Sequence, residues 1–118
     1  MKNSNAETVF MNSMRGHILF PEELISKMYR LYETQEMPQE NIIVPLKVYF
    51  PSGWTWYLYE YYEKEGLFFG LVVGFETEYG YVSKKELENL LVGINYISRD
   101  INWISETKLI DIVNRKVS

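Results

Sequence analysis

The stretch that decides the fold is residues 54–62, Trp54-Thr55-Trp56-Tyr57-Leu58-Tyr59-Glu60-Tyr61-Tyr62. Aromatic and β-branched residues are enriched in strands because they pack well on a pleated surface. Successive side chains of a strand point to opposite faces of its sheet. The pattern therefore predicts two faces, one with Trp56, Leu58, Glu60 and Tyr62 and the other with Thr55, Tyr57, Tyr59 and Tyr61.

Strand-like segments flank this stretch on both sides. Residues 42–50 are rich in Ile and Val, and the following Pro51 and Gly53 are typical of a turn. Residues 67–75 carry an apolar side chain at every second position, with Gly70 and Gly74 between them to allow close approach of a neighbour. We expect a three-stranded antiparallel meander over about residues 42–75, followed by a turn at 76–80.

Helical patterns lie before the meander. Pro21 suits the first turn of a helix, because its missing N–H would have no partner there. Leu24, Met28 and Leu31 follow at helical spacing, which predicts a helix over about residues 21–34. Residues 1–16 are mostly polar and are predicted to form a flexible N-terminal arm.

After the meander, Ser83 and Glu86 have the spacing of a capping box, which predicts a helix over about residues 84–92. Residues 96–104 are predicted to form a strand, with an ordered loop as the alternative, and Leu109 and Ile112 indicate a last helix over about 106–115. The expected fold is α+β: one domain, residues 17–118, with an antiparallel sheet of three to five strands and its helices packed mainly on one face.

Composition excludes several classes of protein. The chain has 118 residues, a formal net charge of −4, no cysteine and one histidine. It therefore has no disulfide scaffold or thiolate metal site, and no overall positive charge to attract nucleic acid or an anionic membrane. No stretch reaches the ~20 apolar residues that span a bilayer. We expect a cytoplasmic protein without a cofactor or metal.

Five short motifs follow one another along the chain: Lys47 with Phe50-Pro51 and Gly53; Thr55-Trp56 with Glu60; Phe69-Gly70-Leu71; Glu78-Tyr79-Gly80-Tyr81-Val82-Ser83 with Glu86-Leu87; and Arg99-Asp100. With the helix at 21–31 they cover residues 18–113 and resemble a domain-of-unknown-function family of small proteins carried on plasmids, conjugative elements and phage-like islands. Many members have an acidic residue where this chain has Val72-Val73-Gly74-Phe75. The resemblance implies mobile-element biology, in which small acidic proteins serve transfer or antagonise host defence systems.

The polar residues of these motifs have two interpretations. Glu60 lies in a central strand, where an unpaired charge is costly, so we expect an ion pair with Arg99 or Lys47. Glu78 is expected to accept hydrogen bonds from its turn. Arg99-Asp100 is expected to form a salt-bridge node, with a recognition pair as the alternative. The functional alternative is that Glu60, Glu78 and Asp100 converge as the carboxylates of a hydrolase or of a divalent-cation site.

The tyrosines suggest an interaction surface. Helices on a single side of a small sheet cannot bury both aromatic faces, so we expect Tyr57, Tyr59 and Tyr61 to be partly exposed. Tyrosine and tryptophan often anchor protein interfaces. The leading hypothesis is a non-enzymatic protein-interaction module of mobile-element origin, one version of which inhibits a host defence nuclease or complex. The alternatives are the carboxylate hydrolase and a single-stranded nucleic-acid-binding accessory protein.

Overall fold

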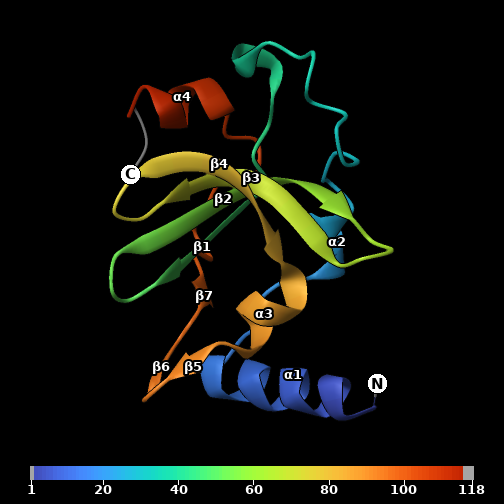
Figure 1. The fold of residues 1–118 in the computed structure, drawn as a ribbon, viewed down its shortest axis with the longest axis vertical. Coiled ribbons are helices and arrows are strands. Elements are labelled where there is room, and N and C mark those ends of the chain that lie inside the picture. The colour runs from blue at the N-terminus through green and yellow to red at the C-terminus, as the bar shows by residue number, and fades with distance from the viewer. Residues whose placement is uncertain (1, 116–118) are drawn as a thin grey trace.

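A five-stranded antiparallel sheet runs through the middle of the molecule (Figure 1). The computed structural model describes residues 2–115. The sheet has the order β4-β3-β2-β1-β7, with β1 at Leu46–Phe50, β2 at Trp54–Tyr62, β3 at Leu67–Val73, β4 at Thr77–Ser83 and β7 at Ser98–Arg99. The predicted α+β class and the central meander are confirmed. The turn predicted at 76–80 is wrong, because those residues lie mostly in β4 and the chain turns at Gly74, whose N–H donates to the carbonyl of Glu76.

Short helices and a small hairpin surround the sheet. They are α1 at Lys2–Arg15, α2 at Glu22–Ile25, the 3-10 turn η1 at Gln39–Asn41, α3 at Lys84–Asn89, the hairpin of β5 (Leu91–Val92) and β6 (Asn95–Tyr96), and α4 at Leu109–Val113. The segment expected to be a flexible arm thus forms a helix. The helix expected over 21–34 is a single turn, because Tyr29 makes backbone hydrogen bonds with Tyr59 and Tyr61 of β2 that an α-helix would not allow.

Both C-terminal helices are shorter than expected. The Ser83 hydroxyl accepts the Glu86 N–H at 3.2 Å, which confirms the predicted N-cap. The helix ends at Asn89, and the chain then forms the β5–β6 hairpin around Gly93, whose φ of +64° favours glycine. Helix α4 begins only at Leu109, since backbone hydrogen bonds hold residues 107–109 extended against residues 42–44.

Strand β2 contains a bulge that changes which face its side chains occupy. Leu58 pairs with Gly70 and Glu60 with Phe69, so Tyr59 is the inserted residue. As a result Leu58 and Tyr61 pack in one core cluster, whereas Tyr57 and Tyr59 pack in the other. The predicted common face of Tyr57, Tyr59 and Tyr61 is therefore wrong.

The glycine opposite the bulge allows the close approach that the sequence predicts. A Cβ on Gly70 would collide with the backbone carbonyl of Tyr57, and one on Gly74 would collide with the ring of Trp54. Gly70 thus requires glycine because backbone atoms fill the space, whereas a side chain at Gly74 would require the Trp54 ring to move.

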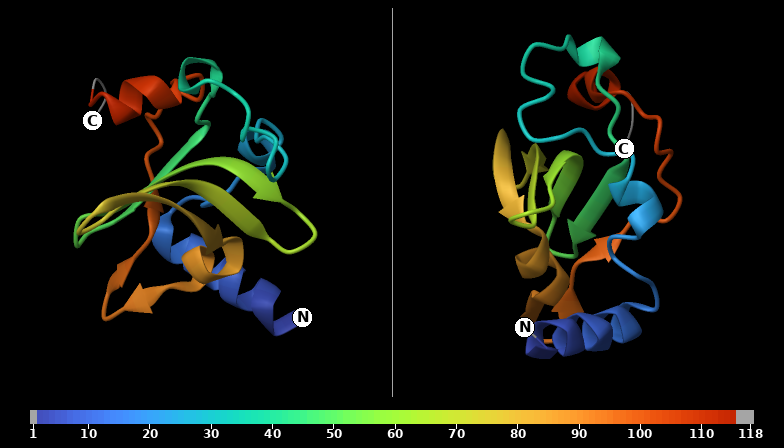
Figure 2. Two further views of the ribbon diagram at one scale, coloured as in Figure 1. Left: turned by 45° about the horizontal axis from the view of Figure 1, so that its top comes forward. Right: turned by 90° about the vertical axis from the view of Figure 1, so that its right-hand side faces the viewer.

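Elements cover both faces of the sheet, as the two views of Figure 2 show. Residues 19–28 and α3 cover one face and contribute Leu19, Phe20 and Leu87 to the first cluster. Residues 37–44 and α4 cover the other face with Ile42 and Leu109, among others. The prediction that helices pack mainly on one face is wrong, and this second cover is the reason that Tyr57 and Tyr59 are buried rather than exposed.

Helix α1 is fastened to the rest of the domain by Arg15. The guanidinium donates to the carbonyls of Ile97 and Glu88 and, at 2.6 Å, to Oδ1 of Asn12. Glu88 lies in the last turn of α3, where carbonyl groups lack helical partners and the helix dipole is negative. Gly16 then ends α1 with a φ of +80°. One buried side chain thus joins three separate segments.

Candidate functional site

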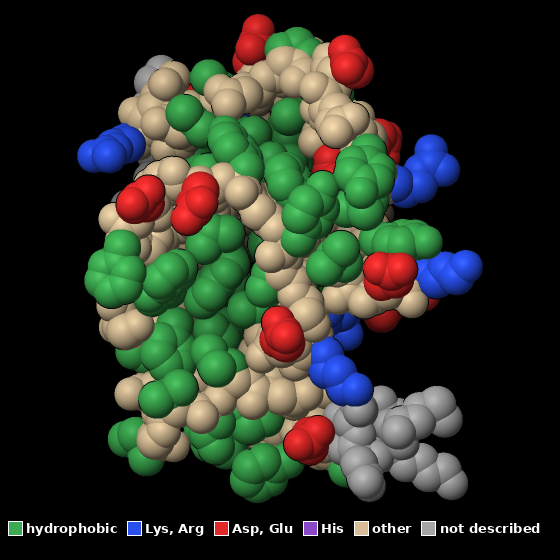
Figure 3. Space-filling view, in the orientation of Figure 1, with side chains coloured by type: hydrophobic (Ala, Val, Ile, Leu, Met, Phe, Trp, Pro, Cys, Tyr) green, Lys and Arg blue, Asp and Glu red, His purple; other side chains and the backbone are tan. Residues whose placement is uncertain are grey.

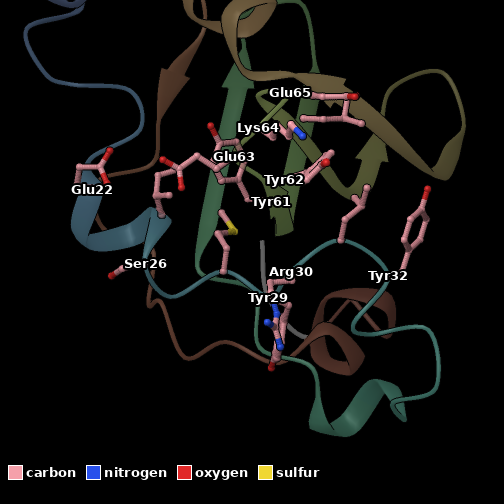
Figure 4. A pocket seen from close by; sticks show the side chains of 14 residues that line it. Glu22, Ser26, Tyr29, Arg30, Tyr32, Tyr61, Tyr62, Glu63, Lys64 and Glu65 are labelled. Carbon is pink, nitrogen blue, oxygen red and sulfur yellow. The ribbon is translucent and has the colours of Figure 1, made fainter.

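A groove of about 1290 Å³ lies between the segment 22–32 and the β2–β3 hairpin. Figure 4 shows Glu22 and Ser26 at one end of it and Tyr32 at the other, with the hairpin residues Glu63 and Lys64 facing the Tyr29 side. Its lining consists of Glu22, Ile25, Ser26, Met28, Tyr29, Arg30, Leu31, Tyr32, Tyr61, Tyr62, Glu63, Lys64, Glu65 and Leu67. The groove exists because the chain leaves its helix after Ile25 and crosses β2 at Tyr29.

The lining combines an apolar, aromatic surface with charged ends. Four of the fourteen lining side chains are tyrosines and four are aliphatic or Met. The charged lining residues are three glutamates, Glu22, Glu63 and Glu65, and two cations, Arg30 and Lys64. Tyr32 and Tyr62 are exposed large side chains. The groove therefore offers aromatic contact area within a weakly acidic rim.

A smaller cavity of about 250 Å³ shares Tyr32 with the groove. It is lined by Tyr32, Thr34, Gln35, Met37, Gln39, Ile42, Tyr59, Glu60, Phe69, Tyr79, Tyr81 and Leu109. The ring of Phe69 lies at its centre, with ring centroids 5.8 Å from Tyr59, 6.3 Å from Tyr79 and 4.8 Å from Tyr81. Cross-strand pairing of β3 with β4 places Tyr81 directly opposite Phe69.

Glu60 is buried at this cavity, with 2% of its surface exposed. One carboxylate oxygen accepts the Tyr32 N–H at 2.8 Å, and the other accepts the Thr34 N–H at 3.1 Å and the Thr34 hydroxyl. The expected ion pair with Arg99 or Lys47 is wrong, because the bulge turns this side chain toward the segment 32–34 instead. Neutral donors satisfy the carboxylate and fix that segment, including Tyr32 with its φ of +71°.

Burial and the negative charge of Glu60 act on the tyrosine hydroxyls of the cavity. Burial is the largest cause that raises the pKa of Tyr59 well above its ordinary value, and the nearby Tyr79 and Glu60 raise it further. The pKa of Tyr81 is raised by desolvation, by its hydrogen bond with Tyr32 and by the charge of Glu60. These phenols therefore stay protonated at neutral pH, and the cavity has a negative field that disfavours a further negative charge.

The other predicted polar residues do not form one site with Glu60. The Lys47 ammonium is 3.5 Å from the Asp100 carboxylate and 5.5 Å from the centroid of the Trp103 ring. The Arg99 guanidinium donates to the carbonyl of Ile18 at 3.2 Å and 3.3 Å. Lys47 thus pairs with Asp100 rather than with Glu60. The expected Arg99–Asp100 salt-bridge node is wrong, because the Arg99 guanidinium binds the chain after α1 instead.

The three carboxylates proposed for a hydrolase are far apart. Glu78 lies exposed in edge strand β4, whereas Asp100 follows β7 at the opposite edge of the sheet. Four strand spacings separate these edges, about 19 Å at roughly 4.8 Å per strand. Within residues 2–115 no group of three His, Asp or Glu side chains could hold a metal ion. Glu60, Glu78 and Asp100 therefore cannot act on one substrate atom.

Sequence reasoning missed the exposed tyrosines Tyr79 and Tyr81, which are 45% and 51% exposed. Their spacing of two residues could have indicated a strand with both tyrosines on one face, since two residues is the period of a strand. The intervening Gly80 favoured a turn instead. Hydrophobic side chains also lie exposed over much of the face in Figure 3, among scattered acidic ones.

No helix formed by residues 2–115 has the length and apolar character needed to cross a membrane.

Comparisons with known proteins give no relative from which a function could be taken. No family model, no curated protein and no solved structure matches this chain.

Proposed function

We propose that this chain is a non-enzymatic protein-interaction module that binds a segment of another protein in the groove between residues 22–32 and the β2–β3 hairpin. The observation that carries the proposal is the size and lining of this groove. Small-molecule sites typically measure about 300–1,000 Å³, and the groove, at about 1290 Å³, exceeds that range. A polypeptide segment fills such an open, elongated space better than a metabolite.

The lining favours a partner segment with apolar anchors and basic flanks. Tyrosine supplies large contact area with few rotatable bonds, which is the reason it is enriched at interfaces. Three glutamates against two cations at the groove, within a chain of net charge −4, favour a basic partner.

The resemblance to proteins of plasmids and phage-like islands supports a setting for this interaction. In that setting the module acts in the cytoplasm of a bacterial host, and its partner is a protein of a host defence complex, such as a nuclease with a basic surface. Binding at that surface would block nucleic-acid access by charge and by steric cover.

Affinity capture with paired variants tests the proposal. Tyr62→Ala removes an aromatic contact in the groove, whereas Tyr49→Ala removes a similarly exposed tyrosine from β1, outside it. The expected result is a host protein that the wild type and Tyr49→Ala retain and that Tyr62→Ala loses by roughly tenfold or more, the cost of an interface hot spot. A partner that binds all three equally, or no partner at all, contradicts the proposal.

A further inference from the structure

The smaller cavity beside the groove has the chemistry of a site for an organic cation. Aromatic side chains form its walls: Phe69 at the centre, Tyr59 edge-on to it at 87°, and Tyr79 and Tyr81 on the neighbouring strand. Ring faces attract a cation within about 6 Å of the centroid because their quadrupole is negative at the face. Tyr32 closes the side that adjoins the groove.

Glu60 gives this cavity a negative charge that forms no ion pair with a cation of residues 2–115. Its three hydrogen-bond donors are two backbone N–H groups and a hydroxyl, all neutral. None of the ion pairs within residues 2–115 includes Glu60. A buried carboxylate without a counter-ion favours a cation brought in by a ligand.

The hydrogen-bond acceptor positions that remain on the Glu60 carboxylate decide which cation fits. Both carboxylate oxygens already accept hydrogen bonds, and one of them accepts two. An ionised carboxylate has about four acceptor positions, so about one remains. This excludes the two parallel bonds that an arginine guanidinium makes with a carboxylate, but it suits the compact charge of an alkylammonium.

The volume of about 250 Å³ sets the size of the ligand. It corresponds to about eight waters at roughly 30 Å³ each. That space accepts one long side chain and excludes a folded peptide.

We propose that this cavity binds the ammonium group of a lysine side chain, methylated or not, that projects from the partner segment lying in the neighbouring groove. The inference rests on the proposed function, because the groove supplies the segment and Tyr32 borders both spaces. The cation lies against the tyrosine and Phe69 rings, with Glu60 beneath it. The lysine selects which segment binds, while the groove supplies contact area.

A titration followed by backbone amide NMR tests this site without any partner protein. The probes are Nα-acetyl-lysine methylamide, its trimethyl-lysine form and the uncharged Nα-acetyl-norleucine methylamide, which has a similar shape. We expect both lysine probes to shift the amide resonances of Tyr32, Thr34, Phe69 and Tyr81, with affinity roughly tenfold above that of norleucine, as a cation–ring energy of ~1.4 kcal/mol implies. Equal binding of norleucine, or shifts that map elsewhere, would overturn the proposal.

Variants at exposed positions distinguish the contribution of an aromatic ring to lysine binding from an effect on folding. Tyr81→Leu removes one aromatic wall and should lower lysine-probe affinity about fivefold or more, whereas Tyr81→Phe keeps the ring and should retain it. Tyr49→Leu, at a tyrosine of β1 that does not line the cavity, is the control and should bind as the wild type does. Unchanged affinity in Tyr81→Leu contradicts the proposal. If Tyr62→Ala loses the partner but no lysine probe binds, the lysine site alone is refuted. If the lysine probes bind but no partner depends on the groove, the proposed function is refuted.

Discussion

Two pairs of tyrosines on the same face of the sheet have opposite environments. Tyr57 and Tyr59 of β2 are 8% and 2% exposed, whereas Tyr79 and Tyr81 of β4 are 45% and 51% exposed. Residue type, strand character and sheet face are the same for both pairs. The difference is the cover: residues 37–44 and α4 pack over the central strands, whereas at the edge strand they leave both tyrosines about half exposed and Gln39 contacts only the Tyr79 hydroxyl, at 2.9 Å.

This contrast shows that the position of a covering segment, rather than the strand itself, determines which aromatic residues are exposed. The covered pair belongs to the second core cluster, whereas the uncovered pair lies at the open side of the cavity at Glu60, which Tyr59 also lines. The central strand and the edge strand are thus expected to differ in their contribution to stability, and paired substitutions on β2 or β3 and on β4 can test the difference.

The largest expected effect comes from Tyr59→Ala. Removing this buried ring leaves a cavity in the second core cluster, and we expect the free energy of unfolding to fall by about 3–5 kcal/mol. Tyr79→Ala should lower it by no more than about 1 kcal/mol, since that ring is nearly half exposed. Urea unfolding of both variants measures the difference. Similar losses in the two variants would show that the edge tyrosines belong to the core.

Gly70→Ala and Gly80→Ala repeat the comparison for two glycines that pair with each other across β3 and β4. A methyl group on Gly70 collides with the Tyr57 carbonyl, so we expect a loss of about 2–3 kcal/mol. Nothing lies within 4 Å of a Cβ on Gly80, and alanine there should be neutral or stabilising by up to about 1 kcal/mol. Thermal unfolding distinguishes the two, and a tolerated Gly70→Ala would argue against the bulge geometry.

Glu60→Gln and Glu78→Gln compare a central with an edge carboxylate. Glutamine at 60 keeps one acceptor but places its amide N–H₂ against the N–H of either Tyr32 or Thr34, so we expect a loss of about 2 kcal/mol. Glu78 is exposed, and its substitution should change stability by less than about 0.5 kcal/mol. Denaturant midpoints measure both values. A neutral Glu60→Gln would mean that the segment 32–34 is held by other contacts.

The smallest effect is expected at alkaline pH. Burial raises the folded-state pKa of Tyr59 above its unfolded value of about 10, so its protonated form stabilises the fold fully below pH ~10 and progressively less as the pH rises. Tyr59→Phe cannot ionise and should shift alkaline unfolding to higher pH. The pKa of Tyr79 is raised less, because a hydrogen bond from Gln39 opposes the effect of burial, so Tyr79→Phe should shift unfolding less. Circular dichroism against pH measures both transitions, and equal shifts would contradict the contrast.

Local sequence patterns predicted those parts of the fold that local interactions determine. The meander, the N-cap at Ser83 and the steric need for Gly70 follow from residue period, hydroxyl chemistry and the absence of a side chain. The faces of β2 did not follow, because a single inserted residue at Tyr59 reverses the alternation without any mark in composition.

The candidate site was less predictable because segments distant in the sequence create it. The cover over Tyr57 and Tyr59 comes from backbone hydrogen bonds that hold residues 107–109 against residues 42–44. The partners of Glu60 lie 26 and 28 residues away, in a segment whose apolar spacing favoured a helix. Sequence reasoning singled out Glu60 but assigned it the wrong partners.

The attachment of α1 through Arg15 has a consequence for the order of folding. Its guanidinium binds carbonyls 73 and 82 residues further along the chain, so these two long-range hydrogen bonds cannot form until the chain has been synthesised as far as Ile97. Anchoring of α1 through Arg15 is therefore a late step in the assembly of the domain. In hydrogen exchange we expect the amides of α1 to open before those of the sheet, as an independent unit.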